Sequence, residues 1–160
     1  MSSDAFVFDA YGTLFDPLSV AARVEALLPG HGADVAKLWR AKQLEYAWLG
    51  SLMEARSDFA AVTAQALEYA LAALALPLDG DGRRALLEAW TTLAPYPDAA
   101  RTLARLAPRP RWILSNGTPA MLEPLVRSSG LGEHLDGVLS VDAAGVYKPS
   151  PRVYALACER

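Results

Sequence analysis

The sequence predicts an α/β fold in which a small parallel sheet carries an inserted helical segment. A short apolar run over 5–9 ends at an aspartate and a Tyr-Gly-Thr turn, as expected of a strand that is buried on both faces. From residue 94 onward, helical and strand patterns alternate with short connections, which is typical of a parallel sheet covered on both faces. Between these parts, residues 17–93 are rich in Ala and Leu at helical spacing.

The pattern divides the chain into a core, residues 1–16 and 94–160, and a helical subdomain, residues 17–93. Breaks at Pro29-Gly30, at Gly50 and over 77–82 predict four helices in the subdomain. The later part of the core predicts alternating elements: a helix over 98–106, a strand over 112–115, a helix over 118–128, a strand over 137–141 and a helix from Ser150.

The composition excludes several classes of protein. No apolar run approaches the roughly 18 residues of a membrane span, and no leader opens the chain, so we expect a cytoplasmic protein that does not enter a membrane. The net charge of -3 comes from mixed acids and bases, without the basic stripe of a nucleic-acid-binding protein. We expect the single cysteine, Cys158, to be buried, and the two separated histidines, His31 and His134, indicate no metal site.

Polar residues follow three of the predicted strands. Asp9, Ser115-Asn116 and the loop 142–148 all lie at carboxyl ends, where open parallel sheets bind ligands. The helices that begin after Thr118 and Ser150 would direct free N–H groups to the same region, which favours an anionic substrate. Each segment alone fits ordinary surface loops, but the three together indicate a site.

These motifs resemble a known family. FDAYGTLFD around Asp9, Ser115-Asn116-Gly117, and Lys148-Pro149-Ser150-Pro151 with Tyr154 resemble the first three motifs of the haloacid dehalogenase superfamily. WRAKQLEYAWLGSLM (39–53) and DFAAVTAQAL (58–67) resemble the helical cap of the L-2-haloacid dehalogenases. The resemblance covers essentially the whole chain and implies a Rossmann-like core of the haloacid dehalogenase type with an inserted helical cap. Members of that family continue well beyond the Tyr154 helix, so we expect this sequence to be the N-terminal part of a longer protein.

Tyr11 decides between activities of this superfamily, most of whose members are phosphatases. The resemblance places Tyr11 where a Mg-dependent phosphatase has an aspartate that protonates the leaving group. A phenol is a much weaker acid than a carboxylic acid, whereas a halide leaves without protonation. We therefore expect a dehalogenase that needs neither metal nor other cofactor. A Mg-dependent phosphatase and an inactive, truncated binding or dimerising module are the alternatives.

The resemblance implies hydrolysis of L-2-haloalkanoic acids to D-2-hydroxy acids. Asp9 would attack C2 of the small-molecule substrate, displace halide and form an aspartyl ester. Lys148 would keep Asp9 ionised, because a nearby cation favours the charged carboxylate. Thr13 would orient Asp9, or else only satisfy backbone groups of its turn. The substrate contacts would come from the core: Ser115 and Asn116 bind the carboxylate, and Tyr154 holds Lys148 or the substrate.

The cap is expected to bind the departing halide. Arg40 borders the apolar stripe of Leu38, Ala41, Leu44 and Trp48. From spacing alone, a solubilising role for Arg40 is the commoner outcome, but the resemblance assigns it to the halide. Tyr11, Leu44 and Phe59 would enclose the apolar part of the substrate. We expect a homodimer, with Trp39 and Trp48 used for packing or for the dimer face.

Overall fold

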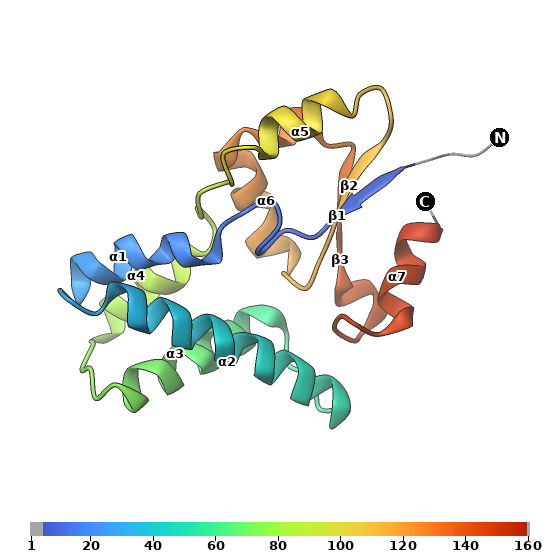
Figure 1. Cartoon of the computed structure of the whole chain (residues 1–160). Helices are drawn as coiled ribbons and strands as arrows, with labels where there is room; N and C mark the ends of the chain where they lie inside the picture. The colour runs from blue at the N-terminus through green and yellow to red at the C-terminus, as the bar shows by residue number, and fades with distance from the viewer. Residues whose placement is uncertain (1–4, 160) are drawn as a thin grey trace. The chain divides into compact units, whose positions relative to one another are not determined.

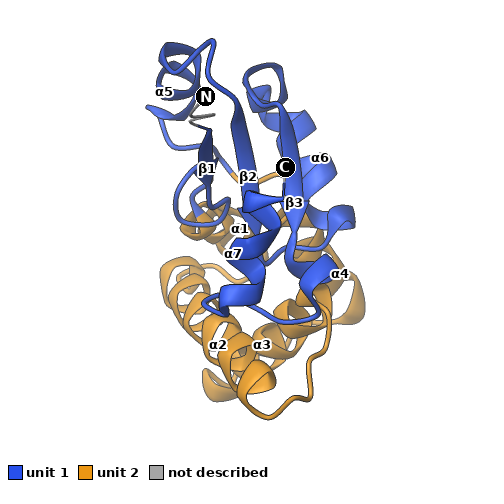
Figure 2. Cartoon of the chain, turned by 90° about the vertical axis from the view of Figure 1, so that its right-hand side faces the viewer, with its two compact units in different colours: residues 1–16, 94–160 blue, residues 17–93 orange. Residues whose placement is uncertain are grey.

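A computed structural model describes residues 5–159. The chain divides into two compact units, residues 1–16 with 94–160 as unit 1 and residues 17–93 as unit 2 (Figure 2). The course of the chain through both units can be followed in Figure 1. None of the helices in the described residues combines the length and the apolar character that a membrane span needs.

Unit 1 is built on a parallel sheet of three strands in the order β1-β2-β3. In this sheet Phe8 pairs with Ile113, and Ile113 pairs with Val138. Its elements are β1 (Phe6–Phe8), α5 (Ala99–Arg105), β2 (Arg111–Ser115), α6 (Pro119–Ser129), β3 (Gly137–Ser140) and α7 (Pro151–Cys158), with short 3-10 helices η2 (Leu131–His134) and η3 (Val141–Ala144). The predicted α/β fold with a parallel sheet is confirmed.

The two faces of the sheet differ. Helices α5 and α6 lie on one side of the strands and α7 on the other (Figures 1 and 2). Val7 and Trp112 line a groove together with residues of α7, so they belong to the second face. Because neighbouring side chains of a strand point to opposite faces, Ile113 points to the first face, and it is buried, as are Leu103 of α5 and Leu122 of α6.

The expectation that the strands are buried on both faces is wrong for the residues described. Val7 is 43% exposed and lines a groove of about 700 Å³ together with Trp112 and Leu139. Among the described α-helices of unit 1, only α7 lies on this side of the sheet, and one short helix cannot cover three strands. Cys158 also lines the groove and is exposed, which corrects the expectation that it is buried.

Unit 2 contains the predicted four helices. They are α1 (Ala21–Leu27), α2 (Gly32–Leu52), α3 (Phe59–Ala73) and α4 (Gly80–Ala89), preceded by the 3-10 helix η1 (Pro17–Val20). Asp58 caps α3 by accepting the Ala61 N–H at 2.7 Å, and Asp79 caps α4 by accepting the Gly82 N–H at 2.7 Å. The break predicted at Gly50 is wrong, because α2 continues to Leu52 and a single glycine costs a helix only about 1 kcal/mol.

The buried row of α2 is not the stripe expected from the sequence. Val35, Trp39, Gln43 and Ala47 are buried, whereas Ala41 and Trp48 of the expected stripe are exposed. Trp39 accounts for the difference. Its ring packs edge-on against Trp90 at a centroid distance of 5.4 Å, and its indole N–H donates to the Thr63 carbonyl at 2.8 Å. Because the large Trp39 ring is buried and hydrogen-bonded, the face of α2 that carries Trp39 is the one that turns inward.

Candidate functional site

Strand β1 delivers Asp9 to the carboxyl edge of the sheet. A tight turn follows, in which the Ala10 carbonyl accepts the N–H groups of Leu14 at 3.0 Å and Phe15 at 2.9 Å. Gly12 has φ +98°, a conformation that glycine adopts readily. The Ala10 N–H donates to Oδ1 of Asp9 at 2.9 Å, so the turn fixes the carboxylate as well as the backbone.

Lys148 reaches Asp9 from the loop after β3. Its Nζ lies 3.1 Å from Oδ1 of Asp9 and also donates to the carbonyl of Leu114, near the end of β2. The backbone N–H of Lys148 donates to Oδ1 of Asn116 at 3.0 Å. The carboxyl ends of the strands thus bring together three of the predicted site residues: Asp9, Asn116 and Lys148.

The two oxygens of the Asp9 carboxylate have different surroundings. Oδ1 accepts both the Ala10 N–H and the Lys148 ammonium, which occupies its lone pairs. The Asp9 side chain is nevertheless 39% exposed, and within residues 5–159 no hydrogen bond to Oδ2 competes with a substrate. The site therefore holds one carboxylate oxygen and leaves the other one able to react.

Asn116 and Ser115 have distinct positions in the turn after β2. The Asn116 oxygen faces the Lys148 N–H, which leaves the amide NH2 of Asn116 as a donor for an anion. Ser115 is buried, and its Oγ accepts the Gly117 N–H at 3.2 Å. The Gly117 carbonyl in turn accepts the hydroxyl of Ser140 at 2.7 Å.

Tyr11 packs directly on this turn. A Cβ atom at Gly117 would lie 2.9 Å from Cε2 of Tyr11, closer than carbon atoms approach in proteins. Only a glycine at this position leaves room for the ring. Tyr11 is buried, so the ring forms part of the wall between the Asp9 turn and the Ser115-Asn116-Gly117 turn.

Thr13 and Tyr154 do not make the contacts expected of them. Both side chains are exposed. Among the described residues, no hydrogen bond joins the Thr13 hydroxyl to Asp9 or the Tyr154 hydroxyl to Lys148. Leu114 and Asn116 hold Lys148 instead. The roles of Thr13 and Tyr154 toward the nucleophile or the substrate stay predictions.

The cap residues of the prediction lie in unit 2. Arg40 is half-buried on α2, and its Nη1 donates to Oε1 of Gln43 at 2.6 Å. Leu44 is half-buried next to Gln43, and Phe59 is buried at the start of α3. Sequence reasoning missed Gln43, although its spacing of four from both Trp39 and Ala47 was a signal that it lies in the buried row.

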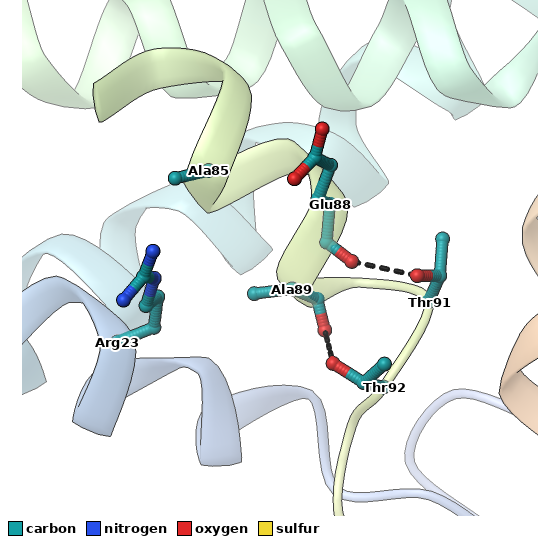
Figure 3. Close-up of a pocket in the computed structure, with 6 residues that line it drawn as sticks. All are labelled: Arg23, Ala85, Glu88, Ala89, Thr91 and Thr92. Atoms are coloured by element: carbon teal, nitrogen blue, oxygen red, sulfur yellow. Dashed lines mark hydrogen bonds between the residues drawn. The ribbon is translucent and has the colours of Figure 1, made fainter. Parts of the chain in front are cut away.

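Unit 2 also has a separate pocket, shown in Figure 3, that contains none of the predicted site residues. The hydroxyls of Thr91 and Thr92 donate to the carbonyls of Glu88 and Ala89 at 2.7 and 3.4 Å. These bonds end helix α4, so the threonines have a structural role. For residues 5–159, no group of three or more His, Cys, Asp and Glu side chains could hold a metal ion.

Residues 3–160 match the family model described as haloacid dehalogenase-like hydrolase. The (S)-2-haloacid dehalogenase of Xanthobacter autotrophicus is 52% identical over 152 residues, which cover 95% of this chain and 60% of that protein. The (S)-2-haloacid dehalogenase of Pseudomonas sp. (strain YL) is 45% identical over 153 residues, which cover 94% of this chain and 66% of that protein. The chain thus spans 60% and 66% of the lengths of these two relatives.

A solved structure supports the same relationship. The L-2-haloacid dehalogenase from Xanthobacter autotrophicus with chloropropionic acid covalently bound superposes with a TM-score of 0.92 at 51% sequence identity. The match covers 97% of this chain and 63% of that one. Together with the paired Asp9 and Lys148 at the carboxyl edge of the parallel sheet, these similarities show that the chain belongs to the haloacid dehalogenase-like hydrolases.

Proposed function

We propose that the natural protein hydrolyses L-2-haloalkanoic acids to D-2-hydroxy acids through an ester on Asp9. The observation that carries the proposal is the Asp9 carboxylate, held at Oδ1 by Lys148 and Ala10 and accessible at its other oxygen. A similar protein, 51% identical, has been solved with chloropropionic acid covalently bound, as a nucleophilic mechanism requires.

The reaction has two steps. Oδ2 of Asp9 forms a bond to C2 of the substrate while the carbon–halogen bond breaks and its electron pair leaves with the halide. Water then adds to the Asp9 carboxyl carbon, the bond from that carbon to the ester oxygen breaks, and the hydroxy acid and a proton are released with Asp9 regenerated. Lys148 favours the first step because its ammonium holds Oδ1 of Asp9 and leaves Oδ2 to attack C2.

The remaining residues are proposed to bind the substrate. The Asn116 amide, with Ser115 in the same turn, binds the substrate carboxylate, because the Asn116 NH2 group is a donor beside the Lys148 ammonium. Arg40 binds the halide, since a guanidinium is always charged and attracts the anion as it forms. Tyr11, Leu44 and Phe59 enclose the apolar part of the substrate. Thr13 is assigned to orient the carboxylate, and Tyr154 to hold Lys148 or the substrate, once substrate is bound, because neither side chain makes these contacts among the described residues.

Tyr11 separates this proposal from phosphatase activity. The residue where a Mg-dependent phosphatase carries its acid is here a buried phenol, which protonates a leaving group poorly. Carbon–halogen cleavage needs no such proton. Residue chemistry at this position therefore favours a halide as the leaving group, and the reaction proposed here uses neither metal nor other cofactor.

The test is halide release from L-2-chloropropionate by the natural protein in the presence of EDTA. We expect steady release that EDTA does not change, no release by Asp9→Asn, and negligible hydrolysis of p-nitrophenyl phosphate. Robust Mg-dependent release of p-nitrophenol would overturn the proposal in favour of a phosphatase. Failure of both assays in a folded protein would favour the inactive binding module.

We further propose that the protein is a homodimer in the cytoplasm. The support for a dimer is a cluster of exposed apolar side chains near the end of α2, where Leu52 is 80% exposed; the cluster comprises Trp48, Leu49, Leu52 and Met53. The cytoplasmic location rests on the composition alone. Light scattering of the purified protein checks the dimer, with Leu52→Glu expected to give the mass of one chain.

A further inference from the structure

Unit 2 contains a continuous chain of hydrogen bonds that leads from the backbone of α3 to Arg40. Nη1 of Arg40 donates to Oε1 of Gln43 at 2.6 Å, and Nε2 of Gln43 donates to Oγ1 of Thr63 at 2.6 Å. The Thr63 hydroxyl donates to the carbonyl of Phe59 at 2.6 Å. These three bonds therefore connect the backbone of the first turn of α3 to the guanidinium on α2.

The direction of every bond in this chain is fixed by chemistry. Arginine can only donate, so the Gln43 oxygen must face Arg40 and the Gln43 NH2 group must face Thr63. The Phe59 carbonyl can only accept, so the single hydroxyl proton of Thr63 points to it. Gln43 cannot be turned around without breaking two bonds, and its rotamer is locked.

The middle of the chain is fully enclosed. Gln43 is 0% exposed and Thr63 is 1% exposed, whereas Arg40 is half-buried. A buried amide is costly unless it is hydrogen-bonded, and an apolar side chain would fill this position in the row of Val35, Trp39 and Ala47 without that cost. The role of a polar residue at position 43 is therefore to accept the hydrogen bond from the Arg40 guanidinium.

The backbone around the chain is also anchored. The indole N–H of Trp39 donates to the carbonyl of Thr63 at 2.8 Å, so the residue before Arg40 is tied to the same residue of α3 that holds Gln43. Trp39 and Gln43, one helical turn apart on α2, thus both donate a hydrogen bond to Thr63. They set both the place of the Arg40 backbone and the direction of its side chain.

We propose that Gln43 is a positioning residue for Arg40, locked in turn by Thr63, and that this pair fixes the guanidinium for the departing halide. The proposal rests on the function proposed above, in which Arg40 binds the halide. A guanidinium that is already oriented binds the anion without first losing side-chain freedom. Gln43 touches neither substrate nor halide and acts only through Arg40.

The test compares Gln43→Leu with Thr63→Val, which removes the Gln43–Thr63 and Thr63–Phe59 hydrogen bonds with little change of shape. The control is Gln65→Leu, the same chemical change as Gln43→Leu at an exposed position of α3. We expect kcat/KM for L-2-chloropropionate to fall about tenfold in Gln43→Leu, because a hydrogen bond to a charged group is lost. The fall in kcat/KM should be smaller for L-2-iodopropionate, because iodide is a better leaving group than chloride and needs less stabilisation. Gln65→Leu should match the wild type.

A double variant separates positioning from a purely structural role. If Gln43 acts through Arg40, Arg40→Ala with Gln43→Leu should be no slower than Arg40→Ala alone. A structural role would lower the rates for chloro and iodo substrates equally and would add to the effect of Arg40→Ala. Equal loss for both halides would therefore overturn the proposal, as would unchanged kinetics in folded Gln43→Leu and Thr63→Val.

A second measurement tests the proposal even if the proposed function fails. In a nuclear magnetic resonance spectrum of the natural protein with ¹⁵N-labelled arginine, the Arg40 Nε–H signal is the one that Arg40→Ala removes. We expect Gln43→Leu and Thr63→Val to shift and broaden this signal, and Gln65→Leu to leave it in place. If the wild type releases no halide, the proposed function is wrong, but the positioning role of Gln43 is still open to test. That role is rejected if the Arg40 signal stays in place in both Gln43→Leu and Thr63→Val.

Discussion

Nζ of Lys148 lies 3.1 Å from Oδ1 of Asp9, although 139 positions separate the two residues in the chain. The parallel sheet brings them together, because Asp9 follows β1 and Lys148 lies in the loop that follows β3. The same ammonium is bound to the carbonyl of Leu114, so the lysine is held at the carboxyl ends of both β1 and β2. The nucleophile and its cation are therefore placed by the core itself.

Replacing Lys148 by methionine should abolish most of the activity. The side chain stays long and unbranched, but the Asp9 carboxylate loses the cation that accompanies it at Oδ1. We expect halide release to fall by about a hundredfold or more, which corresponds to roughly 3 kcal/mol of transition-state stabilisation. Halide release and circular dichroism of the natural protein and the variant check this. Activity near the wild-type value would show that Lys148 serves the loop and not the reaction.

Direct attack by Asp9 predicts the stereochemistry and the path of oxygen. Displacement from the back inverts C2, and water later attacks the Asp9 carboxyl carbon, so an L-haloacid should yield the D-hydroxy acid. In solvent labelled with ¹⁸O, a single turnover should place the label in Asp9 and not in the product. Mass spectrometry of the peptide that contains Asp9 measures this. Label in the product of the first turnover, with none in Asp9, would identify water as the nucleophile.

Arg40→Ala should slow the carbon–halogen cleavage. By analogy with the loss of one donor from an oxyanion site, we expect a fall of about a hundredfold in rate, or about 3 kcal/mol. Lys37→Ala removes an exposed cation of the same helix and serves as the control. If both variants turn over at the wild-type rate, Arg40 does not bind the departing halide and its contact with Gln43 is only structural.

Much of unit 1 was predictable because its elements carry local signals. The strand before Asp9 and the strand before Ser115 are apolar runs that end at polar turns, and proline marks the first turns of α6 and α7. Parallel strands then place their carboxyl ends at one edge, which is why Asp9, Asn116 and Lys148 could be grouped before any geometry was known.

Other features depend on tertiary packing. The Lys148 ammonium donates to the backbone carbonyl of Leu114. Every residue has such a carbonyl, so the identity of Leu114 could not have predicted this bond. The inward face of α2 was mistaken because Leu38, Ala41, Leu44 and Trp48 are as apolar as the true buried row, which includes the polar Gln43. The spacing of apolar residues could not tell which of two adjacent faces of α2 is buried. The packing of Trp39 on Trp90 decides it.

Glu25 predicts a pH dependence of stability. Its carboxylate accepts the N–H groups of Gly30 at 2.7 Å and Gly32 at 2.9 Å, and these bonds hold the pKa of Glu25 below its ordinary value of 4.5. Because the folded-state pKa is lowered, the stabilisation is present above pH 4.5 and is lost as the pH falls through the folded-state value. Glu25→Gln should therefore lower the Tm at pH 7, and the difference from the wild type should shrink as the pH falls below 4.5. Glu133→Gln, an exposed change, is the control, and a difference that stays constant with pH would contradict the assignment.

Gly117→Ala should displace Tyr11 from the wall of the site. The added Cβ would lie 2.9 Å from Cε2 of Tyr11 and 3.0 Å from the Leu122 side chain, and both of these residues are buried and cannot move freely. Overpacking of this kind costs about 1–3 kcal/mol, so we expect a lower Tm and, because the ring lines the substrate pocket in the proposed function, a lower kcat/KM. Gly80→Ala is the matched control, since apart from the adjoining residues and the backbone of its own helix no atom lies within 4 Å of its added Cβ. Its Tm should stay the same or rise slightly. A Gly117→Ala protein with wild-type Tm and wild-type kinetics would show that the turn can move away from the ring and that Tyr11 is not fixed by this contact.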